Sequence, residues 1–211
     1  MSEPDPRRRH RRGEGERLRG ELLDAASRLL AELGDAERLS IRAVAKAAGV
    51  TAPSIYRHFP DKRSLVRAVV EERFRDFDRA LDQAEVGSSD PFDALKRRSR
   101  AYLRFAREHP GHYRVLFSAI SLGPKDVGTY SKAPHPGAAS FFALIDSVQR
   151  CLDAGAHSGS DRAAFFLAVQ LWTALHGMVD LRISKPEMPW PPMEALLEAT
   201  LSDLGLTHPT G

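Results

Sequence analysis

Apolar residues recur at three- and four-residue steps along almost the whole chain, and no segment shows the strict alternation that a half-buried strand requires. Residues 17–33 are the clearest case, with apolar positions at Leu18, Leu22, Ala25, Ala26, Leu29, Leu30 and Leu33. Residues three and four apart lie on one face of an α-helix, so such a segment buries one face against the rest of the chain. The pattern therefore predicts an all-α fold.

Glycines, prolines and capping residues divide this pattern into about nine helices. Gly34 and Gly49 end the first two, while Asp61 and Asp90 have the short polar side chain favoured at a helix N-cap. The sequence His109-Pro110-Gly111 is expected to break the chain after the fifth helix. Helices are predicted at 17–33, 40–48, 52–59, 62–86, 91–108, 113–120, 138–152, 161–183 and 193–204, with a loop at 121–137 and a turn at 155–160.

The positive charge of the chain is confined to its first third. Residues 1–73 hold 16 Lys and Arg against 12 Asp and Glu, whereas residues 74–211 hold 15 against 16. Five arginines lie in the six residues Arg7 to Arg12, a run that repels itself and cannot be buried, so a disordered arm is predicted. Two interpretations of the arm are open. It contacts DNA, along the phosphate backbone or in the minor groove, or it is a solvated tail that aids solubility.

Other features argue against secreted and membrane proteins. Cys151 is the single cysteine and cannot form an internal disulfide, which favours a reducing cytosol. No apolar export segment follows the N-terminal arginines. The uncharged stretch from Ala163 to Val179 has 17 residues, near the lower limit for a membrane helix, and its polar residues favour a buried or interface helix. We expect a cytoplasmic, nucleoid-associated protein with no membrane partner.

The segment 39–62 has the pattern of two short helices joined by a glycine turn. Ala45 is small enough to let the helices cross closely, and Gly49 supplies the turn. The seam between the helices is expected to consist of Val44, Val50 and Ile55. This is the pattern of a helix-turn-helix motif, whose second helix lies in the major groove of DNA with its N-terminal residues at the base edges.

Polar groups in this segment lie where DNA contacts need them. Ser40 and Thr51 each offer a hydroxyl and helix N-terminal N–H groups to a phosphate. Arg42 projects from the first helix, and Lys62 begins the helix after the motif as a further phosphate contact. The exposed face of the second helix is predicted to carry Ala52, Pro53, Ser54 and Arg57, and the DNA backbone is expected to be within reach of Tyr56 and His58.

Residues 17–74 resemble the DNA-binding domain of the tetracycline-repressor (TetR) family of bacterial transcriptional regulators. The resemblance is carried by Gly49-Val50, by the run Ser54-Ile55-Tyr56-Arg57-His58-Phe59, and by Lys62 with Leu65 behind it. It implies phosphate contacts from Tyr56 and Lys62, base readout from the early recognition-helix positions, and DNA contacts overall from Arg42, Thr51, Ala52, Pro53, Ser54, Tyr56, Arg57, His58 and Lys62. Ala52 departs from the pattern because a methyl group reaches at most a thymine methyl, which shifts direct readout to Arg42, Ser54 and Arg57.

The second half resembles the C-terminal domain of a TetR subgroup marked by Trp172-Thr173-Ala174-Leu175-His176-Gly177, with His109-Pro110-Gly111-His112-Tyr113 upstream. The resemblance implies ligand sensing and dimerisation. An apolar cavity between helices is predicted, although any single aromatic residue fits an ordinary packed core better. The polar residues at 170, 173 and 176 either orient a ligand or bond a neighbouring helix. The candidate ligand residues are Tyr102, Phe105, Tyr113, Phe117, Phe141, Ile145, Phe166, Gln170, Thr173 and His176.

Catalytic and metal motifs are not found in the sequence. There is no P-loop, GxSxG elbow, HExxH or dinucleotide fingerprint, so neither an enzyme nor a cofactor is expected. His109 and His112 are three residues apart, but Pro110 and Gly111 between them disfavour helical ligand geometry, so no metal site is predicted. Cys151 is interpreted as a small buried hydrophobe.

These observations predict a homodimeric repressor that binds a pseudo-palindromic operator and is released by a small, hydrophobic ligand. The helices 161–183 and 193–204 have broad apolar faces suited to a four-helix dimer interface, and the helix 62–86 joins the two domains as a lever. The expected division is an arm at 1–15, a DNA-binding domain at 16–62, a connecting helix at 63–87 and a ligand-binding and dimerisation domain at 88–211. The alternatives are a small-molecule-binding protein with vestigial DNA binding, and a non-specific architectural DNA binder.

Overall fold

The structure, a computed structural model, describes residues 14–117, 136–155 and 164–208. These residues form nine helices and no strand, so the predicted all-α fold is confirmed. The helices are α1 (Glu14–Leu33), α2 (Ile41–Ala47), α3 (Ala52–Tyr56), α4 (Lys62–Glu85), α5 (Pro91–Glu108), α6 (Pro110–Phe117), α7 (Ala138–Asp153), α8 (Ala164–Ser184) and α9 (Met193–Asp203). Most of the predicted arm and of the loop at 121–137, and nearly all of the turn at 155–160, lie outside the described residues. Residues 14 and 15, assigned to the arm, belong to α1, which begins three residues before the predicted position 17.

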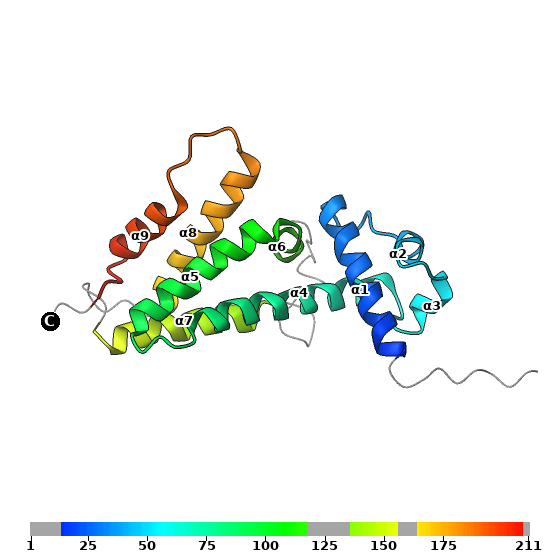
Figure 1. Cartoon of the computed structure of the whole chain (residues 1–211), viewed down its shortest axis with the longest axis horizontal. Coiled ribbons are helices and arrows are strands. Elements are labelled where there is room, and N and C mark those ends of the chain that lie inside the picture. Colours follow the sequence, from blue (N-terminus) through cyan, green and yellow to red (C-terminus); the bar gives the residue numbers. More distant parts are fainter. Residues whose placement is uncertain (1–13, 118–135, 156–163, 209–211) are drawn as a thin grey trace, which may run out of the picture.

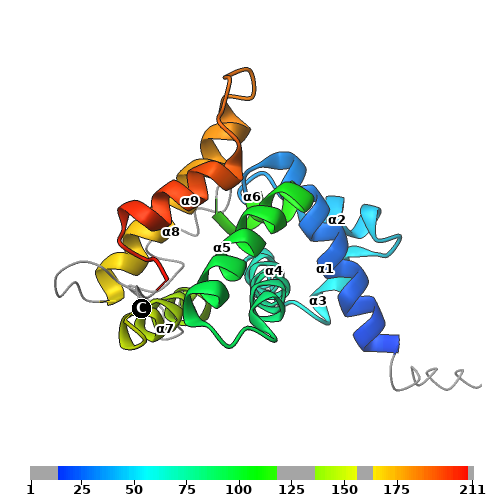
Figure 2. The same cartoon turned by 60° about the vertical axis from the view of Figure 1, so that its left-hand side comes forward.

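The helices are arranged along α4, which joins the two ends of the molecule (Figure 1). Helices α1, α2 and α3 gather at the N-terminal end of α4, while α5 packs along its length and α7 to α9 lie at the far end. Helix α6 lies between the two groups and packs against α1, α4 and α5. In the rotated view, α8 and α9 form an outer pair on the side away from α1 (Figure 2). Residues of α4 and α6 therefore contact both groups.

Side-chain caps set the starts of several helices. The Ser40 Oγ accepts a hydrogen bond from the Ala43 amide at 3.1 Å. Asp61 and Ser64 form a capping box, in which the Ser64 amide donates to Asp61 Oδ1 at 2.6 Å and the Asp61 amide donates to Ser64 Oγ at 3.2 Å. Asp90 accepts from the Phe92 amide at 2.9 Å. The capping roles predicted for Asp61 and Asp90 are confirmed.

The expected break at His109-Pro110-Gly111 is a bend with no loop. Helix α5 ends at Glu108, His109 is its C-cap, and α6 begins at Pro110, because the fixed φ of proline and its missing N–H suit a first helical turn. Gly111 lies in this turn where α6 crosses α1. A Cβ at Gly111 would lie 3.1 Å from the Ala31 Cβ, so the crossing depends on the absent side chain. The sixth helix thus starts three residues earlier than predicted.

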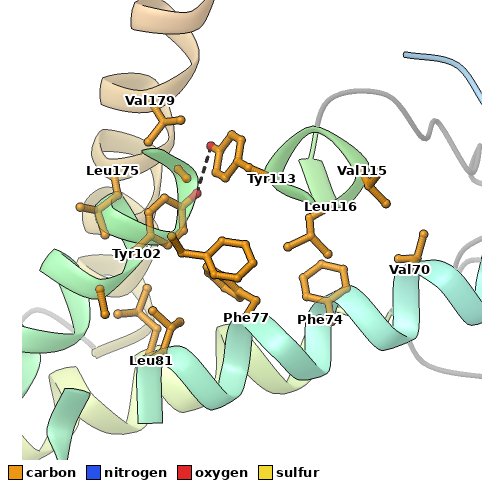
Figure 3. Packing of buried hydrophobic residues seen from close by; sticks show 14 of the residues in the cluster. Val70, Phe74, Phe77, Leu81, Tyr102, Tyr113, Val115, Leu116, Leu175 and Val179 are labelled. Carbon is orange, nitrogen blue, oxygen red and sulfur yellow. Dashed lines mark hydrogen bonds between the residues drawn. The ribbon is translucent and has the colours of Figure 1, made fainter. Parts of the chain in front are cut away.

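Aromatic side chains fill the core between α4, α5 and α6 (Figure 3). Phe77 is buried, and its ring meets Tyr102, Phe105 and Phe117 edge-on at centroid distances of 5.4, 5.1 and 5.8 Å. Cys151 is fully buried, and this burial raises the pKa of its thiol to about 12. The interpretation of Cys151 as a small buried hydrophobe is confirmed.

Helix α8 is apolar over most of its surface. Its most apolar 18-residue window has a mean hydropathy of 1.4, and 33% of that window is buried within the subunit. Length and composition alone would allow α8 to span a membrane, a test that a core helix of a soluble protein also passes. One face packs on the core, but the side chains of Phe165, Phe166, Trp172, Leu181 and Ile183 are exposed. The chain by itself therefore leaves several large apolar side chains of this helix uncovered.

Candidate DNA-binding surface and ligand cavity

Helices α2 and α3 form the predicted helical hairpin. Gly49 has φ +67°, a left-handed conformation that glycine adopts without strain, and the Val50 amide donates to the Ala45 carbonyl at 2.9 Å to close the turn. Val44 and Ile55 are fully buried between the helices, and Ala45 is 4% exposed. The short side chain at position 45 and the glycine turn together let α3 cross α2 closely.

The hairpin presents polar side chains on the surface of α3. Tyr56 is 53% exposed, and Arg57, Thr51 and Pro53 are also exposed. Ala52 and Ser54 are half-buried. Thr51 occupies the N-cap position but makes no side-chain cap to the backbone; its hydroxyl lies 3.0 Å from the Ser54 hydroxyl instead. This face offers hydroxyl, phenol and guanidinium groups together, as a groove-binding helix requires.

Three residues predicted to contact DNA lie outside α3, and each has different surroundings. Arg42 on α2 is exposed. The Ser40 oxygen accepts the Ala43 amide, which leaves its proton for a phosphate oxygen. His58 is half-buried, and its Cε1 lies 3.9 Å from the place a Cβ would take at Gly15. The start of α1 therefore lies beside the end of α3, and the arginine run precedes this point in the sequence.

Lys62 is held by the loop between α1 and α2. Its Nζ donates to the Glu37 carbonyl at 3.0 Å and lies 3.5 Å from Glu37 Oε2. The Glu37 side chain is 91% exposed, so solvent screens the ion pair and its contribution is small. A DNA phosphate can replace this carboxylate as the partner of Lys62.

A cavity of about 610 Å³ lies among α4 to α8. Its wall is mostly aromatic and aliphatic, with a few polar side chains, as expected for a small-molecule site. It is lined by Phe74, Phe77, Leu81, Arg98, Ser99, Tyr102, Leu116, Phe117, Gly137, Ala138, Ser140, Phe141, Leu144, Trp172, Thr173, Leu175 and His176.

Half of the ten candidate ligand residues line this cavity. These are Tyr102, Phe117, Phe141, Thr173 and His176. The others do not, because they point into the core, lie further along a helix or face outward: Phe105 and Tyr113 are buried, Ile145 and Gln170 are half-buried, and Phe166 is 52% exposed. Helical periodicity alone does not separate the cavity-facing positions from their neighbours.

The lining includes residues that the sequence interpretation did not assign. Phe74, Phe77 and Leu81 belong to α4, where three- and four-residue spacing indicated an apolar face but did not say what it contacts. Arg98 had a detectable signal, because it interrupts the apolar stripe of α5 between Leu95 and Tyr102. A charged residue at a core position indicates either a buried partner or a ligand.

Two polar side chains of the cavity wall, Tyr102 and His176, meet the buried Tyr113, which does not line the cavity. The Tyr113 hydroxyl lies 2.8 Å from His176 Nδ1, the Tyr102 hydroxyl lies 3.1 Å from the same nitrogen, and the two hydroxyls are 3.3 Å apart. Figure 3 shows the two tyrosines approaching from α5 and α6. Burial lowers the pKa of His176 and raises the pKa values of both tyrosines. All three groups are therefore uncharged at neutral pH.

A second polar group borders the cavity at Arg98. Its guanidinium Nη1 donates to Asp82 Oδ1 at 3.0 Å and to Glu85 Oε1 at 2.9 Å, and its side chain is 5% exposed. Glu85 also accepts from the Ser147 hydroxyl at 3.0 Å and from Arg150 Nη2 at 2.8 Å. The network joins α4, α5 and α7, and it gives the buried charge of Arg98 two carboxylate partners.

Metal-ligating residue types gather at one place in the described part of the chain, where Asp90, Asp93 and His208 lie within reach of one another. The His208 Nδ1 is 2.9 Å from Asp90 Oδ2, so this polar contact accounts for their proximity. His109 and His112 do not converge on a common point; their rings stack at 5.5 Å, and His112 Nε2 lies 3.2 Å from Arg73 Nη1.

Comparison with known proteins gives matches over most of the chain. Residues 95–204 match the family model described as the tetracyclin repressor-like C-terminal domain, and residues 22–69 match that of the bacterial regulatory proteins, tetR family. An uncharacterized HTH-type transcriptional regulator of Mycobacterium tuberculosis is 32% identical over 149 residues, which are 70% of this chain and 62% of that protein. The regulator EthR of Mycolicibacterium smegmatis is 29% identical over 119 residues, 56% of this chain and 54% of that protein.

The chain thus spans between half and two thirds of the length of these two relatives. A solved TetR family transcription regulator from Marinobacter aquaeolei superposes with a TM-score of 0.69 at 18% identity, covering 90% of this chain and 94% of that one. At this level of identity the superposition supports the fold alone.

Proposed function

Because the chain belongs to the TetR family of bacterial transcriptional regulators, we propose that it is a ligand-responsive repressor that binds a pseudo-palindromic operator as a homodimer. TetR regulators are DNA-binding proteins and generally not enzymes. The observation that carries the proposal is the joint presence of an exposed, polar α3 and a separate apolar cavity. Helices α4 and α6 line this cavity and also pack against α1 of the N-terminal group. In this proposal residues 1–15 are a basic arm, residues 16–62 bind DNA, residues 63–87 connect the two domains, and residues 88–211 bind the ligand and dimerise.

The proposed dimer interface consists of the outer faces of α8 and α9. Two charged residues of α9 are directed toward α5, since Glu194 pairs with Arg100 and Glu198 pairs with Lys96. The outward positions Ala195 and Ala199 are small and uncharged. Beside them, α8 exposes its apolar face, and a second copy of the same pair would cover it as a four-helix bundle.

Coupling between the sites is proposed to run through α6 and α4. Leu116 on α6 lines the cavity, while Gly111 contacts Ala31 and Arg114 Nη1 donates to the Ala31 carbonyl at 2.8 Å. Arg73 also connects α4 to α1, because its Nη2 lies 3.6 Å from Asp24 Oδ1. A ligand that favours one position of α6 would shift the dimer toward a spacing of the two α3 helices that no longer matches half-sites about 34–36 Å apart.

Lys62→Ala is expected to weaken operator binding by roughly tenfold in the dimer and to weaken random DNA equally, because a phosphate contact carries no sequence information. Loss of one phosphate contact per subunit should make the negative slope of log K against log salt shallower, by about two for the dimer. Tyr56→Phe should weaken binding in the same sequence-independent way. Fluorescence anisotropy with a labelled duplex at several salt concentrations measures both quantities.

Lys185→Ala is the control for Lys62→Ala, because it removes an equal charge at an exposed position outside the helix-turn-helix. It should leave affinity and salt slope unchanged. Unchanged affinity in both Lys62→Ala and Tyr56→Phe would contradict the proposed DNA surface.

Operator selection from random duplex DNA tests the function as a whole. A repressor should enrich one pseudo-palindrome and keep it in competition with random duplex at fixed salt. Retention of all sequences equally would instead support an architectural DNA binder, and no retention would support a small-molecule-binding protein without DNA function.

A further inference from the structure

The described lining of the cavity offers a ligand no charge that lacks a counter-ion. Arg98 is the one formally charged residue among the described lining residues, and it is already bonded to both Asp82 and Glu85. No carboxylate lines the described wall. Asp78, the acidic residue behind Ser140, is bonded by the Ser140 hydroxyl. An ionised ligand would lose its water here without gaining a counter-ion, so its binding is disfavoured.

The two tyrosine hydroxyls around His176, in contrast, offer two protons to a single acceptor lone pair. His176 Nδ1 lies within reach of the hydroxyls of Tyr102 and Tyr113, but a neutral imidazole nitrogen has one lone pair. The shorter distance, 2.8 Å, assigns the Tyr113 proton to this nitrogen. If Nδ1 carries a proton instead, it donates to Tyr113, and the hydroxyl protons have one acceptor fewer.

The hydroxyl proton of Tyr102 is therefore the weakly held one. Its remaining acceptor among the described residues is the Tyr113 oxygen at 3.3 Å, well beyond the usual distance for a hydroxyl–oxygen bond. The Trp172 indole, which also lines the cavity, has only a donor and so cannot accept the proton. Tyr102 lines the cavity, so a ligand oxygen can receive this proton.

Arg98 adds a second donor to the same wall. It is four residues before Tyr102 on α5, hence on the same helix face, and its Nη2 is buried without a hydrogen-bond partner among the described residues. Between the polar groups, the wall is formed by aromatic rings, including Phe77, Phe117 and Trp172. Edges and faces of these rings suit a flat aromatic or other apolar body.

We propose that the ligand of this cavity is an uncharged, largely apolar molecule with a hydrogen-bond-accepting oxygen, such as a ketone or ester, and that the Tyr102 hydroxyl donates to this oxygen. The inference rests on the proposed ligand-responsive function and specifies the chemistry of that ligand. The ligand oxygen replaces the Tyr113 oxygen as the acceptor of the hydrogen bond that the Tyr102 hydroxyl donates. The contact between α5 and α6 therefore weakens as the ligand binds. Helix α6 carries Gly111 and Arg114 against α1, so recognition takes place next to the element that contacts the DNA-binding helices.

A matched series of 2-substituted naphthalenes tests the ligand chemistry at constant ring size. The acetyl compound is neutral and has an acceptor oxygen, the carboxylate is anionic, the aminomethyl compound is cationic, and the ethyl compound has no polar group. Calorimetry on the full chain without DNA should find the acetyl compound bound at least tenfold more tightly than each of the other three. Tighter or equal binding of either ion, or absence of binding by the acetyl compound at millimolar concentration, would overturn the proposal.

Tyr102→Phe removes the proposed donor and keeps the ring. It should weaken binding of the acetyl compound by at least tenfold and leave binding of the ethyl compound unchanged. The wild-type protein should lower the frequency of the carbonyl stretch of the bound ketone, and in the variant this frequency should return toward its value in an apolar solvent. Ser89→Ala removes a hydroxyl at an exposed position between α4 and α5, outside the cavity, and should leave naphthalene affinity and carbonyl stretch unchanged. An unshifted carbonyl stretch in the wild-type protein would overturn the assignment of Tyr102.

The two proposals fail separately in these experiments. Operator selection uses the protein without any naphthalene and tests DNA recognition alone. Binding of the acetyl compound by a protein that enriches no operator would refute the repressor and keep the ligand chemistry. Enrichment of an operator by a protein that prefers the carboxylate would do the reverse.

Discussion

Leu181→Glu is expected to convert the proposed dimer into monomers and to lower operator affinity by about a hundredfold or more, because two linked half-site contacts become one. Leu181 lies on the outer face of α8 and is 49% exposed in the subunit. A carboxylate there faces water in the monomer, but in a two-fold interface it would be desolvated opposite apolar residues or its own copy. Light scattering measures the mass, circular dichroism the helix content, and anisotropy the operator affinity.

Val86→Glu is the matched control for Leu181→Glu. Val86 is an apolar residue with 75% exposure, at the end of α4 and outside the proposed interface, so the same charge should leave mass and affinity unchanged. A Leu181→Glu protein with the dimer's mass would place the interface elsewhere. Leu197 is unsuitable for this test although it lies on α9, because it is fully buried within the subunit and a charge there would unfold the chain.

Glu85→Ala is expected to lower the free energy of unfolding by about 3 kcal/mol at neutral pH, since it removes a main counter-charge of a buried guanidinium. Glu85 bonds Arg98, Ser147 and Arg150, so its loss also leaves the Ser147 hydroxyl without that acceptor. Asp82 is the other carboxylate that pairs with Arg98. Its side chain is 67% exposed, so solvent screens this ion pair and weakens it. Urea unfolding followed by circular dichroism measures the change.

Glu71→Ala is the control for this measurement. Glu71 pairs with Arg67 at 2.9 Å on the same helix, but both side chains are partly exposed, so the expected loss is below about 0.5 kcal/mol. Replacing Glu85 and Arg98 together by leucine should recover most of the loss, because no buried charge then remains. A loss in Glu85→Ala no larger than in Glu71→Ala would show that the network is not a stabilising element.

The helix-turn-helix was predictable from the sequence because its determinants are local. Gly49 marks the turn, and Val44 and Ile55 are separated by the spacing that buries both between α2 and α3. Exposure of Arg42, Tyr56 and Arg57 follows from the same periodicity, since positions off the buried stripe face water. The TetR resemblance in these residues agrees with the family matches.

The cavity was predictable only in part, because its wall is made by five helices far apart in sequence. The aromatic residues of α5, α7 and α8 pointed to an apolar site, but nothing local separates Tyr102, which lines it, from Phe105, which does not. The contribution of α4 was missed because an apolar stripe carries no information on its partner.

The sequence by itself determined the helices, their caps, the glycine turn and the surface of α3, since each depends on residues within a few positions of one another. Tertiary structure alone decided which groups meet: His176 with Tyr102 and Tyr113, Lys62 with Glu37, and the α9 carboxylates with α5. These contacts join residues 25 to more than 90 positions apart. They depend on how helices pack across the whole core, and local periodicity does not encode that packing.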